Sequence, residues 1–176
     1  MSPKVIHIFS DASKLLGYAA ILGNKWFSMP WPSVWWTEQN IVLLELVPIV
    51  LALEIWGHTL RDNVVLLHTD NMALVSVINN QKSKEPLVML LVRSLVFNSL
   101  LHNVSLKAIH IPGFLNVDAD LLSRQQVPKF LARNAEVDAT PAQLPRLPDQ
   151  LLSSTKHWAW PTPPSPTRLQ NAMQHH

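Results

Sequence analysis

Residues 4–29 read KVIHIFSDASKLLGYAAILGNKWFSM, and their pattern decides the fold. Apolar and polar residues alternate along the first eight of them, which predicts a half-buried strand. Two further runs of strand-forming residues follow, separated by a Gly-Asn pair typical of a tight turn. The stretch therefore predicts an antiparallel meander of three strands over residues 4–11, 17–22 and 25–29, and Asp11 ends the first of them.

Downstream of the meander, helical and strand patterns alternate. Helices are predicted over residues 41–57, 71–80, 86–102 and 117–123, and strands over residues 63–69 and 104–111. Asn40 and Asn116 stand where they would cap helices. A crossover of two helices joins the fourth strand to the fifth, which favours a parallel pair. The expected fold is α/β: a mixed five-stranded sheet flanked by helices.

Four acidic residues interrupt or end these apolar segments: Asp11, Glu45, Asp70 and Asp120. The chain has only 12 acidic residues among 176, so this placement is informative. An ionised carboxylate beside buried surface is unfavourable unless it is paired, and converging carboxylates raise one another's pKa values. Divalent cations remove both problems, and oxygen-only ligands suit Mg²⁺ or Mn²⁺ rather than zinc. A pair of such ions clamping a phosphodiester is a common nuclease arrangement.

Four segments, in this order, resemble ribonuclease H, and more closely the ribonuclease H of retroelement reverse transcriptases. They are FSDAS at residues 9–13, LLELVPIVLALEIWG at 43–57, LLHTDN at 66–71 and IHIPGFLNVDADLLSR at 109–124. The second and fourth are similar in particular to DIRS-type (tyrosine-recombinase) retrotransposons. The resemblance covers residues 3–124, and the closing segment is its most specific part.

The resemblance implies a ribonuclease H-like domain that hydrolyses the RNA strand of RNA–DNA hybrids during reverse transcription. It implies two Mg²⁺ or Mn²⁺ ions, with Asp11, Glu45, Asp70 and Asp120 as both the metal ligands and the catalytic residues. It also implies a polymerase domain upstream, which we expect to be absent from this chain because the sequence starts directly at the first ribonuclease H strand. Residues 81–85 alone separate the second and third helices, as in several reverse-transcriptase versions that lack an extra helix and basic loop there.

Each acidic residue also has a simpler interpretation. Asp11 fits a turn after a strand, and Asp70 fits the N-cap of the following helix, a role compatible with metal binding. Glu45 and Glu54 lie nine positions apart on one helix and so point to opposite sides. At most one of them is an ordinary surface charge, and the resemblance selects Glu45.

Asp118 and Asp120 compete for the last ligand position. Their spacing of two places them on different faces of a short helix. The helix dipole explains Asp118 in the first turn, and the closing motif favours Asp120.

Charge and composition limit the possible partners. Residues 1–124 carry nine Lys or Arg and nine Asp or Glu, so the expected domain is neutral. Phosphate binding depends on clustered positive charge, and only Lys82 and Lys84 lie close together. Cysteine is absent, which excludes disulfides and thiolate metal sites. We expect no membrane span, because Glu45 and Glu54 interrupt the longest apolar stretch, and no secretory signal, which favours an intracellular location in the cytoplasm or nucleus.

The composition changes after Arg124. Eight of the 14 prolines lie within residues 128–166, and no clear periodicity remains. We therefore expect a ribonuclease H-like domain over residues 1–124 and a Pro-rich extended or disordered tail over residues 125–176.

A non-catalytic alternative stays open. The chain resembles an isolated fragment, so it is also compatible with a remnant or a domesticated module that binds nucleic acid or protein. Many ribonucleases H carry a mobile histidine just after the segment that matches Pro112-Gly113, whereas Phe114 occupies the nearby position here. This departure bears on product release rather than on metal binding.

Overall fold

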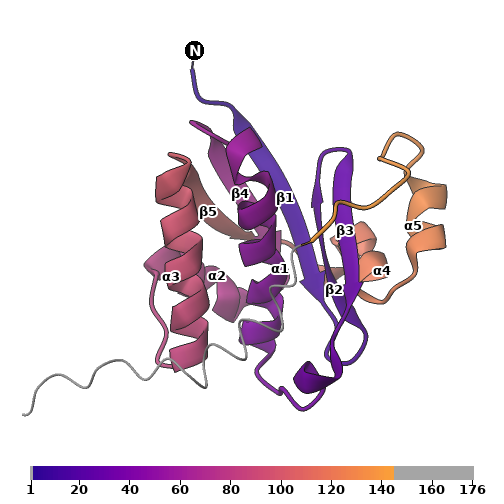
Figure 1. Cartoon of the computed structure of the whole chain (residues 1–176), viewed down its shortest axis with the longest axis horizontal. Helices are drawn as coiled ribbons and strands as arrows, with labels where there is room; N and C mark the ends of the chain where they lie inside the picture. Colours follow the sequence, from indigo (N-terminus) through magenta and orange to yellow (C-terminus); the bar gives the residue numbers. More distant parts are fainter. Residues whose placement is uncertain (1, 145–176) are drawn as a thin grey trace, which may run out of the picture. The chain divides into compact units, whose positions relative to one another are not determined.

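The three N-terminal strands form the predicted meander. β1 (Val5–Ala12), β2 (Gly17–Leu22) and β3 (Lys25–Pro30) pair in antiparallel fashion, and β1 also pairs in parallel with β4 (Val64–Thr69). β5 (Ser105–His110) completes the sheet in parallel with β4, in the order β3-β2-β1-β4-β5. This arrangement is that of a computed structural model of the chain, which describes residues 2–144 (Figure 1). The mixed five-stranded sheet is confirmed.

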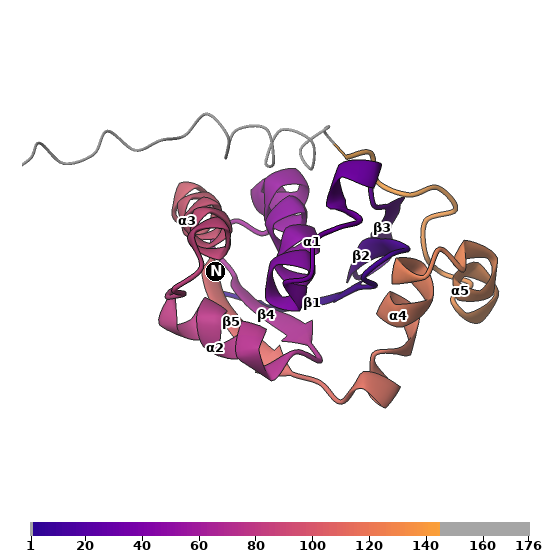
Figure 2. The ribbon, with the colours of Figure 1, turned by 90° about the horizontal axis from the view of Figure 1, so that it is seen from below.

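Helices lie on both faces of this sheet. α1 (Ile41–Trp56) and α3 (Pro86–Leu101) pack together over one face, and α4 (Val117–Ser123) lies on the other face, beside α5 (Val127–Arg133), as Figure 2 shows. Three short 3₁₀ turns complete the described elements: η1 (Ser33–Trp35), η2 (Gly57–Thr59) and η3 (Gly113–Leu115).

α2 (Met72–Asn80) lies along the outer edge of β5. The side-chain amide of Asn79 donates to the Ala108 carbonyl at 2.9 Å and accepts from the Ala108 N–H at 2.8 Å. These bonds satisfy backbone groups that an edge strand otherwise leaves unpaired.

α1 is the core helix. Apart from Glu45 and Glu54 it is apolar on every side, as expected for a helix buried between a sheet and a second helix. Asn40 caps it as predicted, by accepting from the Leu43 N–H at 3.2 Å, and the helix continues through the buried Pro48. The stretch Ile41–Thr59 is long and apolar enough to cross a membrane, but 72% of its most apolar 18-residue window is buried inside this fold. A core helix meets the same length and composition test.

The folded domain extends beyond residue 124, where we expected a tail to begin. α5 follows directly, and Phe130 is only 1% exposed, with its ring centroid 5.3 Å from that of Trp26 on β3. The backbone N–H groups of Asp138 and Ala142 then donate to carbonyls of Asn24 and Trp26, each at 2.8 Å. The expected extended segment is therefore wrong for residues 127–133, because a seven-residue helix with one deep anchor leaves no visible periodicity. The part of the predicted tail beyond residue 144 lies outside the described residues.

Candidate metal centre

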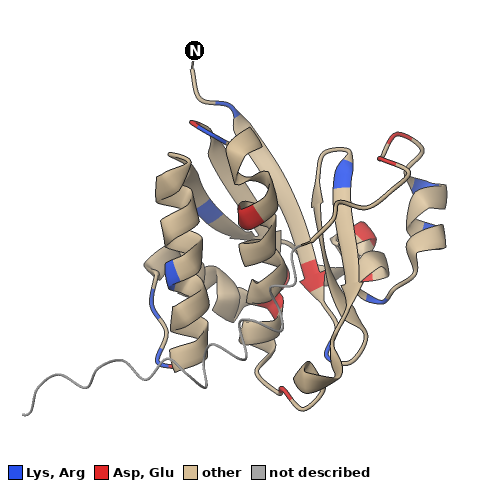
Figure 3. Ribbon diagram, in the orientation of Figure 1, with Lys and Arg blue, Asp and Glu red and all other residues tan. Residues whose placement is uncertain are grey.

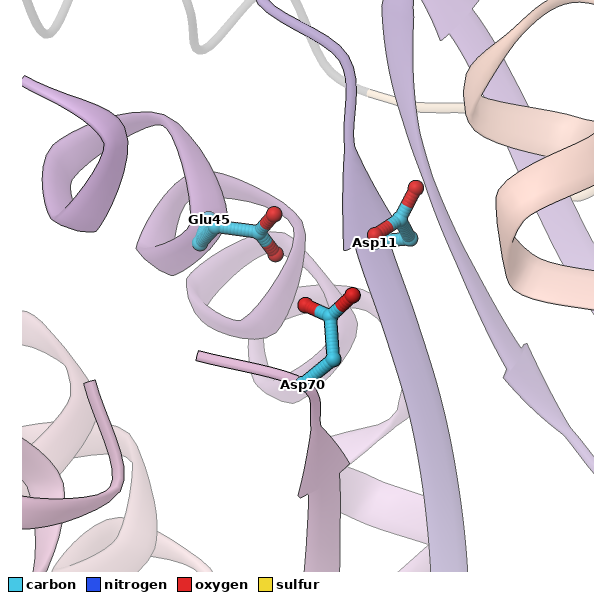
Figure 4. A group of neighbouring side chains, drawn as sticks. All are labelled: Asp11, Glu45 and Asp70. Atoms are coloured by element: carbon cyan, nitrogen blue, oxygen red, sulfur yellow. The ribbon is translucent and has the colours of Figure 1, made fainter. Parts of the chain in front are cut away.

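Parallel pairing of β1 with β4 brings two carboxylates to the same end of the sheet. Phe9 pairs with His68, so Asp11 and Asp70, each two residues further along, come level where the two strands end. Glu45 reaches the same place from the second turn of α1. Figure 4 shows the three carboxylates pointing toward one another from β1, α1 and the end of β4.

The three carboxylates are close enough to share metal ions. One ligand oxygen from each of Asp11, Glu45 and Asp70 lies within 4.8 Å of the other two. Asp11 is 7% exposed and Glu45 is 3% exposed, whereas Asp70 is open to solvent. The cluster is therefore buried on one side and accessible on the other.

Burial and mutual repulsion disfavour negative charge in this cluster. Burial, with smaller contributions from the nearby charges of Asp70 and Asp120, raises the pKa of Asp11 to about 6 against the lowering effect of the Ser123 hydroxyl. Burial also raises the pKa of Glu45 to about 9, with contributions from Asp11 and Asp70. Without a cation, the folded chain therefore holds Glu45 in its protonated form at neutral pH.

One atom of the cluster indicates what the site accommodates. Oε2 of Glu45 is fully buried and has no hydrogen-bond partner among the described residues. A buried polar atom without a partner is rare and points to a missing ligand such as an ion. An all-carboxylate donor set fits a hard divalent cation, Mg²⁺ or Mn²⁺, rather than a soft metal. The ligand chemistry predicted from the sequence thus fits the three residues brought together here.

Asp120, the fourth predicted ligand, lines the same cavity but lies outside the close group. The cavity has a volume of about 530 Å³ and is lined by the following residues: Asp11, Ala12, Ile41, Glu45, Asp70, Asn71, Met72, Asp120 and Arg124. Oδ1 of Asp120 accepts from Nε of Arg124 at 2.8 Å, one helical turn away, and both side chains are about half exposed. Its role as a metal ligand stays a prediction.

Asp118, the rival of Asp120, faces elsewhere. Its Oδ1 accepts from Nε of Arg133 on α5 at 3.1 Å, and it lines a separate hollow of about 680 Å³ on the other side of α4. The two aspartates thus lie on different faces of the helix, as their spacing predicts.

Neighbouring residues leave Asp70 free for the site. Asn71, not Asp70, caps α2, because its side chain accepts from the Leu74 N–H at 3.0 Å. The backbone at Gly113 approaches the Asp70 carboxylate closely, since a Cβ added at Gly113 would lie 3.2 Å from Oδ2 of Asp70. A glycine is therefore favoured beside this carboxylate.

Two polar residues, one just before α4 and one at its end, contact the end of β1 in ways that were not predicted. Asn116 occupies the N-cap position, but its side chain does not cap the helix and instead donates to the Ser10 carbonyl at 3.0 Å. Ser123 donates to Oδ2 of Asp11 at 2.5 Å. Both residues belong to the closing segment, residues 109–124, and membership of that segment was the signal in the sequence that they matter. The partner of each residue could not be predicted, because it depends on how α4 packs on β1.

Positive charge is not gathered around this centre. The Lys and Arg residues lie scattered over the ribbon in Figure 3. Residues 2–144 carry eleven basic and eleven acidic side chains, so the described domain has no formal net charge.

Comparison with known proteins relates this architecture to one fold. No family model matches the chain, and no curated protein matches it. Among solved structures, a ribonuclease H1 isolated from compost by a metagenomic approach aligns with a TM-score of 0.56 at 21% identity, over 74% of this chain and 99% of that chain. The chain has the ribonuclease H fold.

Further solved structures agree. The compost ribonuclease H1 in complex with an RNA/DNA hybrid aligns with a TM-score of 0.56 at 21% identity, over 72% of this chain and 98% of that chain. Ribonuclease H1 from the halophilic archaeon Halobacterium salinarum aligns with a TM-score of 0.54 at 14% identity, over 72% of this chain and 99% of that chain. At such identities the likeness concerns the ribonuclease H fold, and the chemistry of this chain must be argued from its own residues.

Proposed function

We propose that this chain is a metal-dependent nuclease of the ribonuclease H type that hydrolyses the RNA strand of RNA–DNA hybrids. The observation that carries the proposal is the convergence of Asp11, Glu45 and Asp70 within 4.8 Å on a ribonuclease H fold. Burying carboxylates beside one another is unfavourable without a cation, so a purely structural role does not explain their placement.

Each residue has a distinct part in this proposal. Asp11 and Asp70 hold the ions most centrally, and Glu45 and Asp120 complete the ligand set. When bound, a pair of divalent ions supplies Lewis-acid activation of a water and stabilisation of the leaving 3′ oxygen. Arg124 is the cation among the residues that line this cavity, so its guanidinium offsets the repulsion between Asp120 and an incoming phosphate.

The proposed substrate is an RNA–DNA hybrid. One of the aligned ribonuclease H1 structures was solved with an RNA/DNA hybrid, and the same fold in this chain presents its acidic cavity to solvent. Selection of the RNA strand would depend on contacts to its 2′-hydroxyl groups across the minor groove.

We further propose that the chain acts within the reverse transcription of a retroelement. Support comes from the order of the four motifs and from the short connector of residues 81–85 between α2 and α3. A neutral domain binds phosphate backbones weakly, because affinity for nucleic acid rests mainly on neutralising phosphates. A polymerase domain that holds the hybrid would supply the missing affinity.

Cleavage of a labelled RNA–DNA hybrid tests the proposal. The purified chain is incubated with Mg²⁺ or Mn²⁺, with duplex DNA and duplex RNA as substrate controls and Asp70→Asn as the matched variant. We expect cleavage of the RNA strand alone, with loss of activity in the variant and after chelation. Hybrid cleavage that Asp70→Asn leaves unchanged in a clean preparation would show that the metal assignment is wrong.

The non-catalytic alternative predicts a different outcome of the same assay. Metal binding without cleavage of any of the three duplexes, even at high protein concentration, would favour a remnant or binding module.

A further inference from the structure

α4 is attached to the end of β1 by two buried side-chain hydrogen bonds that act on adjacent residues. Nδ2 of Asn116 donates to the Ser10 carbonyl at 3.0 Å, and Oγ of Ser123 donates to Oδ2 of Asp11 at 2.5 Å. Asn116 is 3% exposed and Ser123 is fully buried. One bond therefore holds the backbone just before the metal-ligand candidate, and the other holds its carboxylate.

The Ser123 bond differs from an ordinary helix-docking contact because its acceptor is a carboxylate of the proposed metal centre. A carboxylate turns easily about its terminal torsion, which has a broad energy profile. A hydrogen bond to one oxygen fixes that rotation and leaves the other oxygen to face a ligand.

We propose that Ser123 is a positioning residue for metal binding, whose hydroxyl holds Oδ2 of Asp11 on the α4 side and so directs Oδ1 toward the shared site with Glu45 and Asp70. This role rests on the proposed function, since it concerns the same metal centre. The Asp120 carbonyl, 3.0 Å from Oγ of Ser123, is a second possible acceptor for the single hydroxyl proton. The contact with Asp11 is shorter and its acceptor is a carboxylate, so the proton is assigned to Asp11.

A second serine provides a matched control. Oγ of Ser28 on β3 donates to the Leu122 carbonyl at 2.6 Å, so it attaches the same turn of α4 to the sheet one residue away from Ser123. Its acceptor is a backbone carbonyl rather than a carboxylate. Ser28→Ala therefore removes a comparable attachment of α4 without touching the metal centre.

The test measures Mn²⁺ binding to the full chain by isothermal titration calorimetry, together with thermal unfolding in the absence of metal. We expect Ser123→Ala to weaken Mn²⁺ binding roughly 10-fold to 100-fold, the range typical of residues that support metal ligands. Ser28→Ala should bind Mn²⁺ within about 2-fold of the wild type, although each variant loses one side-chain attachment of α4 to the sheet. Ser123→Cys keeps the shape of the side chain, with a somewhat larger atom and a weaker donor, and is measured in case the alanine variant does not fold.

The outcomes separate the positioning role from simple docking. Wild-type affinity in folded Ser123→Ala or Ser123→Cys would overturn the proposal, as would an equal loss of affinity in Ser28→Ala. Asp70→Asn distinguishes this failure from failure of the proposed function. If the wild type binds Mn²⁺ no better than Asp70→Asn does, the metal centre itself is wrong. If the wild type binds and Asp70→Asn does not, an unaffected Ser123 variant refutes the positioning role alone.

Discussion

Replacing Glu45 by Gln should stabilise the metal-free protein, with a gain that grows with pH. Burial raises the pKa of Glu45 from its ordinary value of 4.5 to about 9 in the folded chain. Because this is an acid with a raised pKa, the stability associated with its proton is fully present below about pH 4.5 and is lost as pH rises toward 9. Asp11, with its pKa raised to about 6, adds to the loss between about pH 4 and 6.

The size of the effect follows from the interval between the two pKa values. At pH 7 the unfolded chain has released the Glu45 proton and the folded chain retains it. About 2.5 pH units separate pH 7 from the unfolded pKa, and each unit corresponds to about 1.4 kcal/mol, so the lost stability is on the order of 3 kcal/mol. Gln carries no titrating proton and keeps a carbonyl oxygen for the bond with the Ala12 backbone, so Glu45→Gln avoids this loss.

Thermal unfolding in chelator between pH 4.5 and 8 measures the difference. We expect equal midpoints for both proteins near pH 4.5, and at pH 7 a midpoint about 10 °C higher for Glu45→Gln, at roughly 3 °C per kcal/mol for a domain of this size. Glu54→Gln on the same helix is the control, because its carboxylate lies outside the cluster and contacts Asn98 instead. A gain in Glu45→Gln that does not change with pH, or an equal pH-dependent gain in Glu54→Gln, would refute the reasoning.

Metal addition should reverse the order of the two proteins. Saturating Mg²⁺ stabilises only a folded state that binds it, by about 4.1 kcal/mol at about 1,000 times the dissociation constant, which exceeds the advantage of Glu45→Gln at pH 7. We expect this stabilisation in the wild type and little of it in Glu45→Gln, whose hydrolysis of hybrids should also fall sharply.

Three further predictions follow from the described domain. Truncation after residue 144 should leave the unfolding midpoint unchanged. Truncation after residue 126 also removes the buried Phe130 and should lower the free energy of unfolding in urea by about 3–5 kcal/mol. Equal stability of the two truncated proteins would contradict the packing of α5. Asp118→Asn breaks an exposed ion pair that contributes about 0–1 kcal/mol and should keep hybrid cleavage, whereas Asp120→Asn should lower cleavage strongly. The reverse ranking in a cleavage assay would move the fourth ligand to Asp118. Hybrid binding by the chain alone should be weak at physiological salt in a fluorescence-anisotropy titration, because residues 2–144 have no formal net charge, and tight binding there would disprove this.

Local patterns in the chain were enough to predict most of the elements and three of the carboxylates that meet at the candidate site. Alternation in residues 4–11, the apolar run around Glu45 and the cap at Asn40 depend on neighbours in sequence, and the described elements agree with them closely. The placement of scarce carboxylates in apolar surroundings predicted a hard-metal centre, and Asp11, Glu45 and Asp70 do meet.

Other features depended on contacts between residues far apart in the chain. Helix α5 forms because Phe130 finds the ring of Trp26 on β3, and the Pro-rich composition around it carries no sign of that partner. Asn116 has the sequence position of a helix cap, yet the nearby Ser10 carbonyl takes its amide instead. The pairing of Ser123 with Asp11, 112 residues away, follows from the packing of α4 against β1. Periodicity and capping are local properties that a sequence displays directly, whereas these contacts exist only once the sheet brings distant segments together.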